Sequence, residues 1–132
     1  MPDKFYTLEE AQALVPWLQR TFDEIDPLMA DARRLEDELG DIMGKVHSNG
    51  HGEMDKPLDR KQKAMRDLTA QIQQKIDSVI ERGIIVRSVD DGLVDFQSVR
   101  EGREVYLCWI KGEREIKFWH ETNVGFAGRQ PL

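Results

Sequence analysis

Residues 107–120, LCWIKGEREIKFWH, gather several side chains that could do chemistry. Cys108, the only cysteine of the chain, precedes Trp109; His120 ends the stretch, and Glu113 lies between them. Thiolate, imidazole and carboxylate groups bind metal ions, and a cysteine thiolate beside a histidine can act as a nucleophile. Whether they form a site depends on which face of the structure each one occupies.

Strand periodicity places Cys108 and His120 on opposite faces. Side chains alternate along a strand, and an even-numbered loop at Lys111-Gly112 puts His120 on the face of Leu107 and Trp109, with Cys108 on the other. A β-bulge would add one residue and reverse this relation. The sequence therefore favours an ordinary strand pair over a Cys–His catalytic pair.

The face that carries Cys108 is expected to be less apolar than the other. It should also carry Arg87, Tyr106 and Trp119, with Asp95 in the row of Arg87 and Cys108. Aromatic rings among charged groups are typical of protein interfaces and of small ligand sites. They also occur in half-exposed sheets with ion pairs that contribute little. We treat Arg87, Tyr106 and Trp119 as a hypothetical interface.

The last residues, VGFAGRQPL, are too short and irregular for a helix. Phe126 is expected to anchor this tail, which is its simplest role. Alternatively, Arg129 recognises a carboxylate or phosphate beside Glu113 or His120. Asp95, Glu113, His120 and Arg129 are therefore the hypothetical ligand-binding residues, with no catalytic residue and no metal ligand assigned.

Two helices are expected before the strands. Thr7 and Glu10 form a capping box for a short leading helix, which should end before Pro16. A long helix is then predicted from about 16 to 45, with a possible kink at Pro27. After a loop signal at 47–57, another helical stripe runs from Leu58 and should stop at Gly83.

His47 and His51 in the loop are four residues apart, but flexible loops rarely preorganise a metal site.

From residue 84 the apolar period changes to two. Turn signals at 90–92, 101–102 and 111–112 separate strand-like runs and predict an antiparallel meander of three to four strands. The expected fold is α+β in a single domain, 1–132. Residues 1–83 form a long antiparallel helical hairpin with a short leading helix, and 84–132 form the sheet and an irregular tail.

Composition limits the possible partners. The chain has 132 residues and a net charge of −6, and neither half has a basic excess, so nucleic acid is not expected. No apolar run is long enough to span a membrane. One cysteine allows no internal disulfide, and a cytoplasmic location without a cofactor is expected. Two helices cannot cover each other's apolar faces alone, so we expect a homodimer, with a protein partner possible.

Several segments resemble a known family. FYTLEEAQALVP near the start, and GLVDF, YLCWIKGE, FWH and GFAGR later, are similar to the uncharacterised bacterial family known as domain of unknown function two thousand two hundred and three. The resemblance implies a small cytoplasmic prokaryotic protein without a known activity. It implies signature positions at Gly92, Leu93, Asp95, Phe96, Leu107, Cys108, Trp109, Gly112, Glu113, Trp119, His120, Gly125, Phe126 and Arg129.

Two functions remain open from the sequence. The first is a non-enzymatic, dimeric interaction or assembly protein whose helical hairpins form the dimer core. The alternative is a small-ligand- or metal-binding protein, with an enzyme included in this class, whose polar site lies at the sheet end and the C-terminal tail.

Overall fold

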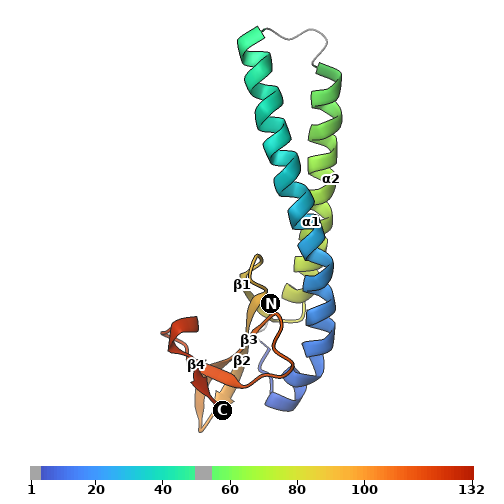
Figure 1. Cartoon of the computed structure of the whole chain (residues 1–132). Helices are drawn as coiled ribbons and strands as arrows, with labels where there is room; N and C mark the ends of the chain where they lie inside the picture. Colours follow the sequence, from blue (N-terminus) through green and yellow to red (C-terminus); the bar gives the residue numbers. More distant parts are fainter. Residues whose placement is uncertain (1–3, 50–54) are drawn as a thin grey trace. The chain divides into compact units, whose positions relative to one another are not determined.

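The computed structural model describes residues 4–49 and 55–132. Two helices, α1 (Leu8–Asn49) and α2 (Asp55–Ile80), precede an antiparallel sheet, which makes the fold α+β as expected (Figure 1). Residue contacts divide the chain into two compact units. One comprises Met1–Asp23 and Lys75–Leu132 and holds the sheet; the other is Glu24–Gln74 and is helical. No helix in the described residues is apolar enough over a sufficient length to cross a membrane.

Helix α1 begins at the expected capping box. The Thr7 hydroxyl accepts from the Glu10 amide at 3.1 Å, and Glu10 accepts from the Thr7 amide at 2.9 Å. The short leading helix is wrong, because α1 runs without interruption through Pro16 and Pro27. Both prolines are exposed, so water can bond the carbonyl groups that they leave without an amide partner.

The packing of α1 explains this continuity within the sheet unit. Ala11, Val15, Leu18 and Phe22 are buried at spacings of four and three residues, which is one continuous stripe across Pro16. Burial of a whole stripe favours an unbroken helix over one that ends before the proline.

In the helical unit, the two helices run in opposite directions (Figure 1). Lys61 Nζ on α2 lies 2.7 Å from Glu38 Oε2 on α1. Most apolar side chains of this unit are only half-buried, namely Leu28, Met29, Leu35, Leu39, Ile42, Leu58, Met65, Leu68 and Ile72. The side chains of His47 and His51 lie outside the part of the chain that the structure describes.

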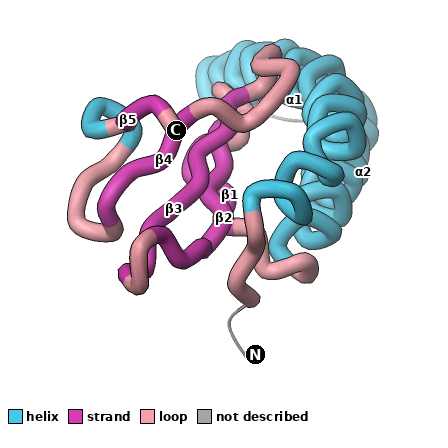
Figure 2. The backbone as a smooth tube through the Cα atoms, turned by 90° about the horizontal axis from the view of Figure 1, so that it is seen from below, coloured by secondary structure: helices cyan, strands magenta, loops and turns pink. Residues whose placement is uncertain are grey.

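The sheet has five strands in chain order: β1 (Ile85–Ser88), β2 (Leu93–Arg100), β3 (Arg103–Ile110), β4 (Phe118–Glu121) and β5 (Gln130–Pro131) (Figure 2). The expected meander was therefore one strand short. The tail is also more ordered than expected, since a 3-10 turn, η2 (Phe126–Gly128), leads into β5. Glu101 and Gly102 both have positive φ, which gives the two-residue hairpin turn predicted between β2 and β3.

The apolar face of β2 and β3 was predicted correctly. Val94 pairs with Trp109 and Phe96 with Leu107, and all four are buried. Phe22 of α1 lies 6.2 Å from Trp109, measured between ring centroids. The sheet therefore uses this face to cover the first turns of α1 in the same unit.

The register of β4 differs from the prediction. Leu107 pairs with Trp119 and Tyr106 with His120, so His120 lies on the face of Tyr106 and Cys108. The reason is that residues 111–117 do not form a regular strand. Gln19 Oε1 accepts from the Gly112 amide and Gln12 Oε1 from the Ile116 amide, at 2.8 and 2.7 Å, and these bonds fix an irregular path.

Candidate functional site

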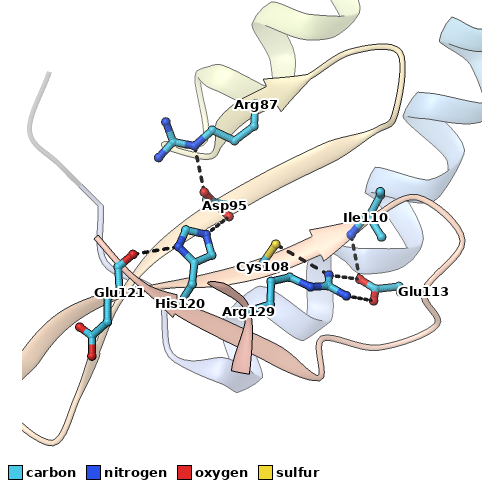
Figure 3. A network of polar contacts seen from close by, with 8 residues as sticks. All are labelled: Arg87, Asp95, Cys108, Ile110, Glu113, His120, Glu121 and Arg129. Atoms are coloured by element: carbon cyan, nitrogen blue, oxygen red, sulfur yellow. Dashed lines mark hydrogen bonds and ion pairs between the residues drawn. The ribbon is translucent and has the colours of Figure 1, made fainter. Parts of the chain in front are cut away.

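A buried aspartate–histidine pair lies at the centre of the sheet face that carries Cys108. Asp95 on β2 is 2% exposed and His120 on β4 is also 2% exposed. The His120 Nε2 atom lies 3.0 Å from Asp95 Oδ1, while Arg87 Nε donates to Asp95 Oδ2 at 2.9 Å (Figure 3). This bond to Asp95 raises the pKa of Arg87. Each oxygen of Asp95 therefore has its own partner, His120 for Oδ1 and Arg87 for Oδ2, and together they fix the orientation of the carboxylate.

The orientation of the His120 ring is set by its other nitrogen. Nδ1 lies 2.9 Å from the carbonyl oxygen of Glu121. A carbonyl can only accept a hydrogen bond, so Nδ1 carries hydrogen and donates it. Nε2 is thereby directed into the site, which is the usual arrangement of a histidine that ligates a metal.

Cys108 on β3 completes a cluster with these two residues. It pairs with Asp95 across the strands, and its side chain is buried. The ligand atoms of Asp95, Cys108 and His120 all lie within 4.8 Å of one another. Burial raises the pKa of Cys108 to about 11, although Arg129 opposes this rise. The side chain is therefore a thiol at neutral pH unless a cation displaces its proton.

The C-terminal tail reaches the same cluster through Arg129. Its Nη1 and Nη2 atoms bond the two oxygens of Glu113 at 3.3 and 3.2 Å, and Nη1 lies 3.8 Å from the Cys108 sulfur (Figure 3). The rings of Phe118 and Phe126 lie 4.0 and 4.4 Å from its guanidinium carbon. Burial lowers the pKa of Arg129, but the bonds to Glu113 and Cys108 outweigh this effect and the net shift is upward.

Glu113 is itself held in place. Its Oε1 atom accepts from the Ile110 amide at 2.8 Å, and its backbone carbonyl accepts from the Trp109 indole at 2.8 Å. The tail is therefore joined to the end of β3 through one arginine and one glutamate.

A cavity of about 430 Å³ opens beside the cluster. Asp95, Cys108 and His120 form one wall, and the segment from Thr122 to Phe126 forms another. A small molecule in this cavity could contact all three side chains. Every buried side-chain nitrogen or oxygen of the described residues already has a hydrogen-bond partner, so an added ligand would exchange bonds rather than fill an empty position.

The four hypothetical ligand-binding residues meet in this network. Asp95 and His120 form its buried pair, Glu113 and Arg129 form an ion pair, and Cys108 lies between the two pairs. The separation of Cys108 from His120 was wrong, because the β4 register brings them to one face. The sequence signal for this irregular segment was the three successive charged residues Glu113, Arg114 and Glu115, which do not alternate with apolar residues as in a half-buried strand.

The hypothetical interface residues do not stay together. Arg87 and Tyr106 remain on the site face, with the guanidinium 5.1 Å from the ring centroid. Trp119 pairs with Leu107 on the opposite face and is 7% exposed, because the register of β4 is shifted. Trp119 is therefore not available to a partner on the site face.

Comparison with known proteins gives one result. The family model described as "Uncharacterized conserved protein (DUF2203)" matches residues 4–132. No curated protein and no solved structure matches the chain significantly. The match covers nearly the whole chain, including every residue of the site. The chain therefore belongs to the DUF2203 family of uncharacterized conserved proteins.

Proposed function

We propose that the protein binds one divalent transition-metal ion through Asp95, Cys108 and His120. The observation that carries the proposal is that these three buried side chains bring their ligand atoms within 4.8 Å of one another. Carboxylate, thiolate and imidazole together suit Zn²⁺ and similar ions, whereas Ca²⁺ and Mg²⁺ prefer oxygen ligands alone.

The distances between the three ligand atoms are close to those around a bound metal ion, so the side chains would have to move only a little. Two donors bound tetrahedrally to zinc are about 3.4 Å apart. The His120 Nε2 and Asp95 Oδ1 atoms are 3.0 Å apart, so an ion would replace the contact between them without a large shift. The three donors lie within 4.8 Å of one another, so the longest donor separation needs to shorten by at most about 1.4 Å.

Each donor also has a partner behind it. Glu121 holds the His120 ring, Arg87 holds the free oxygen of Asp95, and Arg129 contacts the Cys108 sulfur. Such outer contacts orient metal ligands, and their loss commonly weakens metal binding about 10- to 100-fold. A divalent ion would displace the thiol proton of Cys108, so metal binding should release protons.

Three protein ligands leave a coordination position open. The adjoining cavity is where a further ligand would reach that position. Structural zinc sites are usually closed by four protein ligands, while sites that act on small molecules keep one position for water or substrate. We therefore propose a site that acts on a small molecule rather than one that only stabilises the fold.

Cobalt loading tests the proposal directly. Protein purified without chelators would be treated with Co²⁺, and the near-ultraviolet thiolate-to-cobalt band and the metal content would be measured. Wild type should take up one ion per chain with the thiolate band. Cys108→Ser should lose the band, and His120→Gln should bind at least about 10-fold more weakly. The double variant His47→Ala/His51→Ala, which lacks the other two histidines, should behave as wild type.

Three results would refute the metal site, and the first two are as follows. One is a wild-type protein that takes up neither Co²⁺ nor Zn²⁺ at micromolar concentration. The other is a Cys108→Ser variant with the same affinity and spectrum as wild type. Loss of binding in the double variant alone would place the ion at the other histidines instead.

A second candidate function is dimeric assembly through the helical unit. It is supported by the half-buried apolar residues of that unit, among them Leu39, Met65, Leu68 and Ile72. A second copy of the same two helices would cover them in a four-helix bundle, the usual solution for such helices. No nucleic-acid or membrane partner is needed for this role.

Sedimentation at micromolar concentration tests the assembly. Wild type should be a dimer, and Leu68→Glu should be a monomer that keeps its helical content. The exposed substitution Glu36→Gln is the control and should leave the dimer intact. A monomeric wild type would exclude assembly and leave the metal proposal unaffected.

A further inference from the structure

We infer that the open side of the metal site takes a small organic carboxylate with an apolar group. This inference rests on the proposed metal site and adds the class of its ligand. One carboxylate oxygen would occupy the open position on the ion, and Arg87 would bind the other.

The charges around the cavity favour a monoanion. The carboxylate of Asp95 and a metal-bound thiolate of Cys108 balance the two charges of a divalent ion, and a ligating histidine is neutral. Arg129 lies against Glu113 and contributes no net charge. Among the described residues that line the cavity, Arg87 then supplies one uncompensated positive charge. A ligand with a single negative charge restores neutrality.

Arg87 is placed to orient a carboxylate. Its Nε atom is fixed on Asp95 at 2.9 Å, and the ring of Tyr106 lies 5.1 Å from the guanidinium carbon. In Figure 3 the two terminal nitrogens of Arg87 point away from Asp95 and make no drawn contact with the other labelled residues. The side chain is 43% exposed, so a small molecule can reach it from the solvent side. A guanidinium presents several donors in one plane, which matches the two oxygens of a carboxylate.

Part of the remaining cavity wall is apolar, beside Thr122, Asn123 and Gly125. Leu93, Val124 and Phe126 contribute to its lining, and Val124 and Phe126 are 42% and 46% exposed. Exposed large apolar side chains beside a concave polar site are typical of ligand pockets. The volume of about 430 Å³ lies within the range of small-molecule sites, roughly 300–1,000 Å³. An acid with a ring or a short branched chain fits both properties.

Benzoate and benzamide provide a matched pair of probes. They share a ring and differ in charge. Cobalt-loaded protein would be titrated with each, and the visible bands of the cobalt would report any ligand at the open position. Benzoate should shift the bands saturably at millimolar concentration, and benzamide should bind at least about 10-fold more weakly.

Variants identify the role of Arg87. Arg87→Gln should weaken benzoate about 10-fold or more and still take up one cobalt per chain. Arg87→Lys should recover part of the affinity, because it keeps the charge. Lys117→Gln also removes one positive charge, but Lys117 is exposed and pairs with Glu115, so this variant should match wild type.

The outcomes separate the two proposals. Cobalt uptake without any effect of benzoate, or equal binding of benzamide, overturns the carboxylate ligand and leaves the metal site standing. Unchanged benzoate affinity in Arg87→Gln does the same. A response to inorganic phosphate but not to benzoate would replace the carboxylate by a phosphate class. A wild type that takes up no cobalt overturns both proposals.

Discussion

Substitution of Asp95 by asparagine should separate the stability of the site from its metal binding. Asparagine has the same shape as aspartate. Its oxygen can accept from Arg87 Nε, which now lies 2.9 Å from Asp95 Oδ2. Its amide nitrogen can donate to His120 Nε2 once that atom carries no hydrogen, because Nδ1 keeps its own hydrogen for the carbonyl of Glu121. Asp95→Asn therefore leaves every hydrogen bond of the buried pair in place.

Asp95→Ala removes both bonds. His120 is 2% exposed, so its Nε2 atom would be buried without a partner, at a cost of about 1–3 kcal/mol. Arg87 is 43% exposed, and water can replace its lost bond at little cost. Adding the lost packing of the side chain, we expect Asp95→Ala to lower the free energy of unfolding by about 2–4 kcal/mol. Asp95→Asn should lower it by less than about 1 kcal/mol.

Urea unfolding with a chelator present measures these differences in the metal-free protein. In parallel, cobalt titration should show that Asp95→Asn binds the ion at least about 10-fold more weakly, because a neutral amide replaces a charged ligand. Equal destabilisation by asparagine and alanine would refute the proposed hydrogen-bond exchange. Full cobalt affinity in Asp95→Asn would remove Asp95 from the ligand set.

Three more predictions concern the surroundings of the site and a nearby turn. The pKa of Cys108 is raised to about 11 in the folded protein, so the unfolded chain loses this proton at lower pH than the folded one. Relative to Cys108→Ser, wild type should lose about 2 kcal/mol of unfolding free energy between pH 9 and 11 and little below pH 8, as urea titrations at each pH would show. Arg129→Met should lower the free energy of unfolding by about 2 kcal/mol and speed proteolysis of the tail, because it leaves the half-buried Glu113 without its cation. Glu113→Gln should lower the free energy of unfolding by less. Equal stability of Arg129→Met and wild type would contradict this prediction. Gly92→Ala should lower the melting temperature more than Gly102→Ala. Both glycines have positive φ, but only at Gly92 would the new Cβ meet another side chain, the Cβ of Lys111 at 2.6 Å. The reverse order of melting temperatures would contradict this prediction.

Local patterns in the sequence determined much of this protein. The Thr7–Glu10 capping box starts a helix, and the Glu101-Gly102 turn forms the hairpin between β2 and β3, because both depend on residues that are close in the chain. The apolar face of β2 and β3 follows from alternation once that short turn is fixed. The four hypothetical ligand-binding residues were also named from the sequence, although their contacts were not.

Only the tertiary structure decided that Cys108 and His120 share a face. The path of residues 111–117 is held by Gln12 and Gln19, which are about a hundred positions away in the chain. No periodicity within the strands reports such bonds, and a shift of one residue reverses every side chain that follows. The same holds for α1, where burial of a stripe shared with the sheet outweighs the local preference of Pro16 to end a helix. The sheet unit was thus readable strand by strand, whereas its site depended on how a distant helix fixes the entry to β4.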